Sequence, residues 1–378
     1  MIMANIFVSS TGPKGTGNGI NEANAMDLAN ALSLVTAGDY VWIKNDGVYY
    51  GNFVVGCSGS YNDNTHIYFI GYNNIENCDF VNHISDMDFG QPFWGGPSKP
   101  NSANCWVNIN GNGAADNVVY QYQKHNIHWR NIHFNNTSKT SGASAYYVKY
   151  TYGTTFTKCK FTDSYINLWI DLNSASCVIN CCYFGNYTSV NMDITTGSNL
   201  IFIINSVFQG GQLRMFKSMC FNNIFIGGNY AVGAHAYQNI VFNNTMYDQT
   251  SYCLGYGHAS YVCHLMEYNN VFVPASKSVP TIYKSSNGTM TFSGYGNAYC
   301  VRDNSILDTP YVGLHGLNVN PQFVNADGND FRILNPAILR GGMPDYTGQR
   351  GQIGAGAQEY QFSKRSATAN RARLSVIK

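Results

Sequence analysis

Charged residues are scarce in this 378-residue chain: Asp, Glu, Lys and Arg together make up only 11% of it, whereas about a quarter is usual. The net charge of +1 gives no general basis for binding nucleic acid or an anionic membrane. No run approaches the roughly 18 apolar residues of a membrane span. Leucine, the usual core residue of helices, occurs only 15 times. These absences argue against a helical protein and against a membrane-spanning helix.

Asparagine, glycine and aromatic residues are abundant instead. The chain holds 47 Asn, 38 Gly, 28 Tyr and 21 Phe. Asn and Gly are poor helix formers that suit turns, and Tyr and Phe are enriched in strands. The composition therefore predicts an all-β protein made of many short strands.

Motifs for metal binding and for common catalytic chemistries are also missing. The eleven cysteines are odd in number and form no C-x-x-C pair, which argues against a zinc site. G-x-S-x-G, H-E-x-x-H, P-loop and EF-hand sequences are absent. Asp86 and Asp88 form a single carboxylate pair without the further oxygen ligands that calcium needs. His125, His128 and His133 show no ligand spacing and are typical of a packed β-surface. We predict no metal site, no cofactor, and cysteines that are mostly buried and unpaired.

A repeat runs through the middle of the chain. Strand-like stretches end in Asn-x-x-aromatic, and two further units keep the aromatic residue but lose the Asn. From Phe134 to Phe272 the aromatic residues follow one another at intervals of 27, 23, 24, 17, 22 and 25 residues. The units are Asn77 to Phe80, Asn131 to Phe134, Lys158 to Phe161, Cys181 to Phe184, Asn205 to Phe208, Asn222 to Phe225, Asn244 to Tyr247 and Asn269 to Phe272.

Units of 17 to 27 residues with short strands and no helix cannot bury both of their faces alone, so successive units must stack. The predicted fold is a parallel β-helix, a solenoid whose coils lie about 4.8 Å apart, so that equivalent residues form ladders. We expect the aromatic residue to stack inside and the Asn to occupy a turn, where it tolerates a left-handed backbone. A β-sandwich of hairpins is the alternative, but the few Asn-Gly turns do not follow the strands.

The chain divides into three segments. Residues 1–37 are expected to form an N-terminal strand and a capping helix, which would cover the open first coil. Residues 38–360 are expected to form the β-helix, with a long irregular loop at 84–104. Residues 361–378 are a basic C-terminal arm. The helix is predicted at residues 22–35, where one face carries Ala25, Leu28, Leu32 and Val35.

Both ends of the chain carry motifs of a known kind. Residues 6–12, 38–49 and 67–71 form the opening pattern, and residues 320–338 and 353–355 form the closing pattern. With these motifs the chain resembles the pectate-lyase-like superfamily of single-stranded right-handed parallel β-helix proteins, over about residues 5–360. The resemblance implies the fold but no single function, because the superfamily includes polysaccharide lyases, hydrolases, phage tailspikes and other virion proteins.

Two departures from the superfamily limit what the resemblance implies. Gln352 stands where the closing motif usually has Asp. Trp169-Ile170-Asp171-Leu172 matches the Trp-Ile-Asp-His strand of pectate lyases except for the His, and no Arg-x-Pro-x-x-Arg follows. A calcium-dependent lyase is therefore not expected.

The spacing of the repeat points to one candidate catalytic pair. Asp171, Asp193, Lys217 and His235 lie nine or ten residues after a ladder aromatic, so they are expected to share one outward column, although strand alternation would point Arg214 outward in place of Lys217. Asp171 and Asp193 on adjacent coils would lie about 5 to 8 Å apart, within the range of glycosidase acid pairs. The alternative is that outward positions are polar in any case and carry no chemistry.

Three residues are candidates for carbohydrate binding. Trp169 is expected to point outward, where a sugar could stack on it. Trp94 lies in the 84–104 loop, and His235 belongs to the predicted outward column.

The C-terminal 18 residues carry five cations and no acid, whereas the preceding 360 residues have a net charge of −4. A tail of this composition is usually a solvated extension. The alternative that we favour is an assembly arm that adds apolar anchors to another subunit, or packs on its own body. Its candidate contact residues are Phe362, Lys364, Arg365, Arg371, Arg373, Leu374, Val376 and Ile377.

The function that we expect is that of a non-enzymatic virion protein of a phage or similar virus, either a capsid decoration protein or a tail spike. The start of the chain lacks a Sec signal, so we expect a protein made in the host cytoplasm, released by lysis and exposed on the virion surface. Its partners would be other virion subunits, further copies of itself (a trimer is one possibility) and a host surface glycan. The alternatives are an enzyme that depolymerises polysaccharide and a carbohydrate-binding adhesin.

Overall fold

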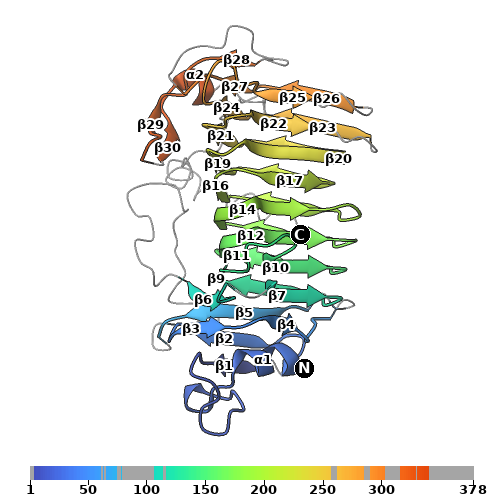
Figure 1. The fold of residues 1–378 in the computed structure, drawn as a ribbon, viewed down its shortest axis with the longest axis vertical. Coiled ribbons are helices and arrows are strands. Elements are labelled where there is room, and N and C mark those ends of the chain that lie inside the picture. Colours follow the sequence, from blue (N-terminus) through green and yellow to red (C-terminus); the bar gives the residue numbers. More distant parts are fainter. Residues whose placement is uncertain are drawn as a thin grey trace, which may run out of the picture.

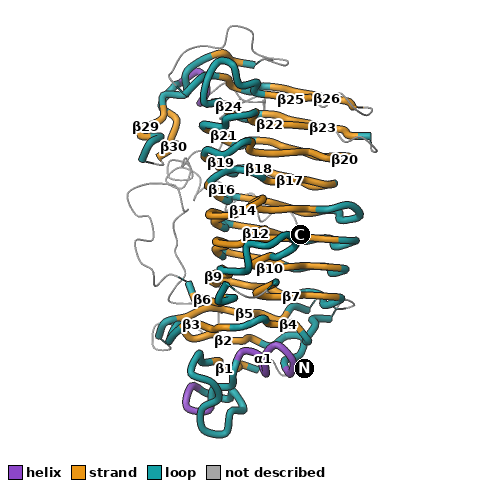
Figure 2. Tube along the Cα trace, in the orientation of Figure 1, coloured by secondary structure: helices purple, strands orange, loops and turns teal. Residues whose placement is uncertain are grey.

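The computed structural model describes residues 4–60, 63, 65–74, 78, 106–113, 116–256, 262–284, 290–302, 316–328 and 330–339. Short parallel strands stack along the long axis of the molecule, from β1 at the N-terminal end to β28 near the other end (Figure 1). Strands dominate the described chain and helices are few (Figure 2). The protein is therefore an all-β parallel solenoid, and the fold predicted from the repeat is confirmed.

Strand pairing divides the solenoid into three ladders of parallel strands, called face 1, face 2 and face 3 below. Face 1 contains β1 (Asn5–Val8), β2 (Tyr40–Lys44), β5 (Ile67–Tyr72), β8 (Ile127–Arg130), β11 (Thr155–Thr157), β13 (Val178–Asn180), β15 (Ile201–Ile204), β18 (Ser218–Phe221), the second half of β20 (Tyr230–Phe242), β23 (Cys263–Tyr268) and β26 (Met290–Tyr295). Face 2 contains β3 (Val48–Tyr50), β6 (Val107–Asn110), β9 (Ile132–Asn135), the first halves of β12 (Lys160–Asp171) and β14 (Tyr183–Ile194), β16 (Val207–Gln209), β19 (Ile224–Ile226), β21 (Thr245–Tyr247), β24 (Val271–Val273), β27 (Ala298–Tyr299) and β28 (Leu317–Asn318). Face 3 contains β4 (Phe53–Val55), β7 (Asn117–Tyr122), β10 (Ser144–Lys149), the second halves of β12 and β14, β17 (Leu213–Phe216), the first half of β20, β22 (Tyr252–Tyr256) and β25 (Ile282–Lys284).

An aromatic ladder runs inside face 2, as the repeat predicts. Consecutive ring centroids along it are 5.3, 5.0, 4.6 and 4.7 Å apart, and every ring is fully buried. The five rings are Phe134, Phe161, Phe184, Phe208 and Phe225. The ladder defines the register of the solenoid, because each ring stacks on its equivalent in the next coil.

The predicted ladder is wrong at one coil. Met246, and not Tyr247, pairs with Phe225 below and Phe272 above. The reason lies in the turn before the strand, where Asn243, and not Asn244, adopts the left-handed conformation with φ 54°. Tyr247 falls in a neighbouring apolar cluster at the C-terminal end.

The turn residues behave as their sequence suggests. The residue three positions before each ladder side chain has a φ between 51° and 59°, a region that Asn tolerates better than most residues. These residues are Asn131, Lys158, Cys181, Asn205, Asn222, Asn243 and Asn269. In the last three of these turns the next residue is also Asn, and one coil further on Asn297 follows Gly296 in the same way. The side chains of these four asparagines point inside.

Those inward asparagines form a buried hydrogen-bonded ladder. Asn223 Nδ2 donates to Asn244 Oδ1 at 3.0 Å, and Asn244 Nδ2 donates to Asn270 Oδ1 at 3.1 Å. Asn270 Nδ2 donates to Asn297 Oδ1 at 3.2 Å, and all four residues are fully buried. Each amide therefore exchanges water for a partner one coil away, which limits the cost of burying it.

The N-terminal helix is shorter than predicted. Residues 22–35 contain a 3-10 turn, η1 (Glu22–Asn24), and a seven-residue helix, α1 (Leu28–Leu34). The Asp27 side chain accepts a hydrogen bond from Asn30 N, and with this N-cap the helix begins at Leu28, six residues later than expected. Leu28, Ala31 and Leu32 are buried, and α1 contacts β1 and β4 at the N-terminal end of the solenoid (Figure 1).

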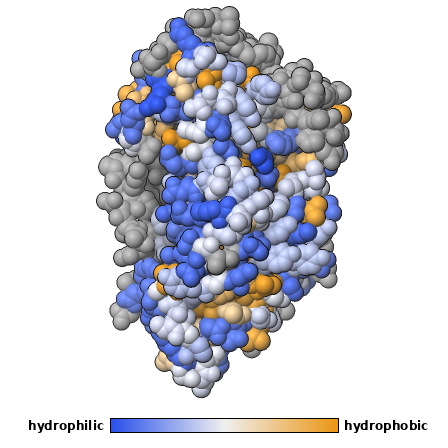
Figure 3. Space-filling view, viewed as in Figure 1, coloured by the Kyte–Doolittle hydropathy of each residue, from blue (hydrophilic) through white to orange (hydrophobic). Residues whose placement is uncertain are grey.

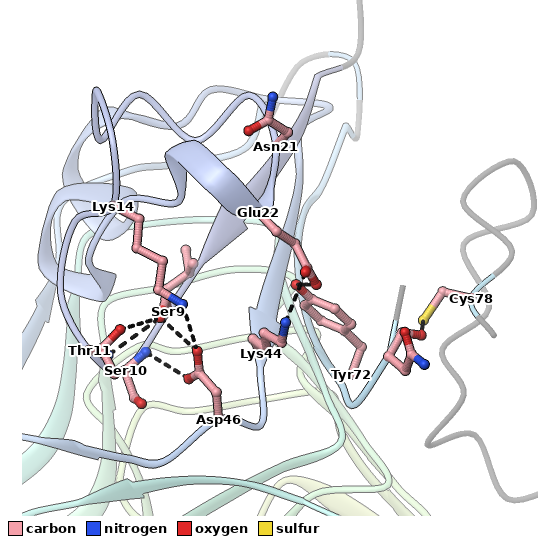
Figure 4. A network of polar contacts seen from close by, with 12 residues as sticks. Ser9, Ser10, Thr11, Lys14, Asn21, Glu22, Lys44, Asp46, Tyr72 and Cys78 are labelled. Carbon is pink, nitrogen blue, oxygen red and sulfur yellow. Dashed lines mark hydrogen bonds and ion pairs between the residues drawn. The ribbon is translucent and has the colours of Figure 1, made fainter. Parts of the chain in front are cut away.

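Polar contacts join the first two strands, at the opening motif (Figure 4). Ser9 Oγ donates to Asp46 Oδ2 at 2.7 Å and Ser10 N donates to Asp46 Oδ1 at 2.9 Å. Although burial opposes the charged form, these hydrogen bonds hold the pKa of Asp46 below its usual value. Beside them, Glu22 accepts hydrogen bonds from Lys44 Nζ and Tyr72 OH, at 2.8 and 2.7 Å. The opening motif is therefore tied together by contacts among β2, β5, η1 and the turns that follow β1 and β2.

The C-terminal end departs from the parallel solenoid. β29 (Phe323–Asn325) and β30 (Asp330–Ile333) pair antiparallel and lead into α2 (Pro336–Leu339). Among the described residues the parallel ladders therefore end at β28, and the predicted boundary at residue 360 stays a prediction. The 84–104 loop with Trp94, Asp86 and Asp88, the first repeat from Asn77 to Phe80 apart from Cys78, and the arm at 361–378 lie outside the described residues.

The buried titratable groups are mostly neutral. The ten described cysteines are free thiols, and eight of them are buried. Burial lowers the pKa values of His128 and His133 to about 3, so both rings are neutral parts of a packed surface, as expected.

Within the described chain no helix is long and apolar enough to cross a membrane, and no cluster of metal-ligating side chains occurs.

One acidic side chain lies inside the solenoid. Glu267 of β23 is fully buried, accepts a long hydrogen bond of 3.5 Å from Asn270 Nδ2, and has no partner for its Oε1 atom. Burial raises the pKa of Glu267 to about 8, and the Asn270 amide opposes this shift only in part.

Candidate functional site

Aromatic side chains line the outward side of face 3 in its N-terminal half. Tyr120 of β7, Tyr147 of β10 and Trp169 of β12 occupy one register position on successive coils. The ring centroids of Tyr120 and Tyr147 are 5.3 Å apart, and those of Tyr147 and Trp169 are 4.7 Å apart. Alternation along the strand explains their outward position, because Leu168 and Ile170 on either side of Trp169 are buried. Three rings thus form a ladder on the outer surface.

Three tyrosines continue this line in the C-terminal half. The ring of Tyr252 of β22 lies between those of Tyr230 of β20 and Tyr283 of β25, with centroids 5.1 and 5.3 Å apart. Two glycines, Gly233 and Gly255, stand in the register column of Tyr120, Tyr147 and Trp169. Gly255 makes room for the Tyr252 ring, because a Cβ atom on it would lie 2.5 Å from that ring.

An ion pair separates the two aromatic ladders. Asp193 of β14 pairs in register with Trp169 and with Arg214 of β17. Arg214 Nη1 lies 3.2 Å from Asp193 Oδ2, and Arg214 Nε donates to Tyr230 OH at 3.2 Å. Burial raises the pKa of Asp193 above its usual value, Arg214 opposes this shift, and the nearby charge of Asp171 adds to it. Arg214 therefore contacts both Asp193 and Tyr230, the first tyrosine of the C-terminal aromatic ladder.

Asp171 lies beside this line. It pairs in register with Lys149, two positions along the strand from the column of Trp169 and Asp193. Tyr147 OH donates to Asp171 Oδ2 at 2.6 Å, and Thr195 Oγ1 donates to Asp171 Oδ1. Both carboxylate oxygens are thus bound within the protein, and Asp171 is only 8% exposed.

The single column predicted for the candidate catalytic residues is wrong. Asp193 pairs with Trp169 and Arg214, while Asp171 belongs to the next column. Lys217 lies in the turn between β17 and β18 and lines a groove on face 1. Arg214 takes its place, as strand alternation indicated. His235 lies on β20 at a register shift, between two alanines that pair with Met215 and Phe216 of β17.

The tyrosines were missed in the sequence, although they carry a signal. Tyr120, Tyr147 and Trp169 are 27 and 22 residues apart, and Tyr230 and Tyr252 are 22 residues apart. These intervals match the lengths of the coils. Tyr147 stacks on the indole ring of Trp169, and the stacking of a sugar on Trp169 stays a prediction.

The strip that these residues form on face 3 is called the aromatic strip below. Its rings stack on one another along the axis, so it presents ring edges, phenol hydroxyls and the Asp193–Arg214 pair to the outside. Tyr hydroxyls donate and accept hydrogen bonds, and the ring edges remain apolar. The side of the molecule seen in Figure 3 is mostly hydrophilic or neutral over the middle coils, with a hydrophobic patch over the N-terminal coils. The strip is chemically suited to a ligand with alternating hydroxyl and apolar surface.

Comparison with known proteins gives a structural match only. No protein-family model matches the chain, and no curated protein matches its sequence. Pectate lyase Pel9A is similar in structure, with a TM-score of 0.55 at 14% sequence identity, over 94% of this chain and 96% of that one. The match confirms the pectate-lyase-like solenoid fold that the end motifs imply.

Two further structures are more distant. An alginate lyase from Paenibacillus sp. str. FPU-7 has a TM-score of 0.45 at 11% identity, over 76% of this chain and 97% of that one. Tailspike protein 2 from Escherichia coli O157:H7 bacteriophage CAB120 has a TM-score of 0.21 at 12% identity, over 80% of this chain and 41% of that one.

Proposed function

We propose that the aromatic strip binds a glycan and that the protein is a glycan-recognising solenoid without catalytic activity. One observation carries the proposal: six aromatic rings, with an acid–arginine pair in their middle, form a line along one outer face. Seven coil steps from Tyr120 to Tyr283 span roughly 35 Å. A ligand that repeats along its own length fits a surface that repeats every coil, and a polysaccharide is such a ligand.

The carboxylates of the strip favour binding over catalysis. A general acid or base must exchange a proton with the substrate. Asp171 has both oxygens engaged by Tyr147 and Thr195, and Asp193 is paired with Arg214. This arrangement supports the carbohydrate-binding alternative from the sequence and gives the depolymerase alternative less support.

Binding to a panel of bacterial surface polysaccharides tests the proposal. We expect the wild-type protein to bind at least one of them, and Trp169→Ala to weaken that binding about tenfold, equivalent to 1.4 kcal/mol. Tyr68→Ala, which removes an outward aromatic ring from β5 on face 1, is the matched control and should bind like the wild type. A wild-type protein that binds nothing in a broad panel, or equal binding by all three proteins, would contradict the proposal.

The same panel separates binding from cleavage. We expect no shortening of any bound polysaccharide. If the wild type shortens a polysaccharide and Asp171→Asn and Asp193→Asn abolish that activity without a change in melting temperature, the enzymatic alternative replaces this proposal.

We further propose that the protein displays this strip on a virion surface, as a decoration protein or tail spike. The low charge and the basic arm at 361–378 in the sequence support this location. Negative-stain images of particles, labelled with an antibody to this chain, test it. Unlabelled particles from a producing host would overturn the assignment.

A further inference from the structure

The outward side of face 1 changes character along the solenoid. On β8 and β11 the outward residues are His128, Arg130, Thr155 and Thr157. From β13 to β23 two adjacent columns are apolar or aromatic except for Asn180, and Gln238 and His264 form a polar column beside them. One column contains Val178, Phe202, Met219, Ile240 and Met266, and the other contains Ile204, Phe221, Phe242 and Tyr268. These nine residues are called the apolar patch below.

The apolar patch is accessible although its side chains do not point into the core. Each of the nine is partly exposed, and inward neighbours such as Ile203 and Val241 are fully buried. Phe221 and Phe242 stack with centroids 4.9 Å apart, outside the solenoid. A contiguous apolar area on an outer sheet face marks an interaction site more often than chance exposure.

A groove borders the patch along the turns that precede these strands. It has a volume of about 640 Å³, and Met219, Ile240 and Met266 line it together with Leu200 and Tyr237. Leu200 is 56% exposed and Tyr237 is 37% exposed. The surface thus offers both protruding apolar side chains and a recess beside them.

We propose that the apolar patch is the interface with a second copy of this chain. An interface related by a two-fold axis uses the same patch on both subunits, so the patch must complement itself. A flat, uncharged sheet face meets this condition, because two such faces pack about 10 Å apart with their side chains interdigitated. The mixture of aromatic, Met and aliphatic residues without a charge is also typical of homodimer interfaces.

The size of the patch fits a reversible dimer. The patch spans five coils that lie about 4.8 Å apart, and a strand with its flanking turns is about 20 Å long. Together these lengths give a footprint of roughly 500 Å² per copy. The total of about 1,000 Å² lies at the low end of specific interfaces. We therefore expect association that depends on protein concentration in the micromolar range.

Charge argues against the C-terminal arm as the occupant. Lys217 lines the groove, and its Nζ atom lies 4.4 Å from the ring centroid of Tyr237. Among the described residues no Asp or Glu lines the groove or belongs to the patch. The five cations of residues 361–378 would thus meet a cation and no acid.

Sedimentation velocity of the full-length protein, from low to high micromolar concentration, tests the proposal. We expect a monomer that shifts to a dimer in the wild type. Ile240→Glu and Met219→Glu each place a charge in the patch and should hold the protein monomeric at all concentrations. Thr155→Glu, on the polar part of the same face, should dimerise like the wild type. Thermal melting at the lowest concentration shows that every variant is folded.

The outcomes are distinguishable. A wild type that stays monomeric throughout overturns the proposal, as does dimerisation that neither Ile240→Glu nor Met219→Glu weakens. A protein that dimerises only after deletion of residues 361–378 would identify the arm as the occupant and would also overturn it.

Discussion

The inside and the outside of this solenoid share one register but not one pattern of side chains. Inside face 2 the same residue type recurs from coil to coil, as in the ladder from Phe134 to Phe225. On the outer side of face 3 the chemistry changes from aromatic to charged and back within eight coils. On the outer side of face 1 it changes from polar to apolar.

The difference separates stability from function. An inward side chain is surrounded on all sides and has its equivalents above and below, so packing selects its type. An outward side chain needs only to avoid disrupting its strand, so ligands and partners can select its type. We therefore expect substitutions inside to change stability most and substitutions outside to change binding most.

The largest effect is expected from Phe184→Ala in the interior ladder. Phe184 is fully buried between Phe161 and Phe208, with centroids 5.0 and 4.6 Å away, so its loss should cost about 3–5 kcal/mol of unfolding free energy. Phe221→Ala removes an outward ring from a similar stack and should cost about 1 kcal/mol. Urea unfolding at a concentration below self-association measures both. Equal losses would break the distinction between inside and outside.

The interior could largely be predicted from the sequence because packing acts on it coil by coil. The spacing of the aromatic residues identifies six ladder rings, the five named above and Phe272, and fails at one of the three places where two asparagines stand together. At Asn222–Asn223 and Asn269–Asn270 the first Asn takes the left-handed turn. At Asn243–Asn244 the first Asn also takes the left-handed turn, which makes Met246 the ladder residue. Comparison with the other two Asn-Asn pairs would therefore have predicted the correct register.

The second effect in size concerns the acid inside the solenoid. The folded protein holds the proton of Glu267 up to about pH 8, whereas the unfolded chain releases it near pH 4.5. Between these values the folded state binds more protons, so stability should fall as the pH rises, by a few kcal/mol in all. Glu267→Gln keeps the shape and removes the charge. Thermal melting at pH 5 and pH 8 should show a gap between wild type and variant that widens toward pH 8, with the variant more stable. A constant gap would mean that Glu267 is ionised in the folded protein.

The outer columns were harder to predict because the path from the ladder to face 3 varies in length. Trp169 follows its ladder ring by 8 residues, Asp193 by 9 and Arg214 by 6. A register shift between Ser164 and Ile166 is one cause. Counting a fixed nine or ten residues therefore brought Asp171 and Lys217 into a column to which neither belongs.

The smallest effect on stability is expected from the ion pair in the aromatic strip. Asp193 and Arg214 lie on the outer surface, and the Arg214 side chain is 37% exposed, so solvent screens their attraction. A double-mutant cycle with Asp193→Asn and Arg214→Gln should give a coupling below about 1 kcal/mol. Because Arg214 opposes the rise in the pKa of Asp193, Arg214→Gln should raise that pKa further, which carbon NMR of the carboxyl group can follow. A coupling of several kcal/mol would show that the pair stabilises the solenoid. It would contradict the view that residues of the aromatic strip contribute to binding more than to stability. A small coupling combined with weaker glycan binding by both variants would place the pair among the groups that recognise the ligand.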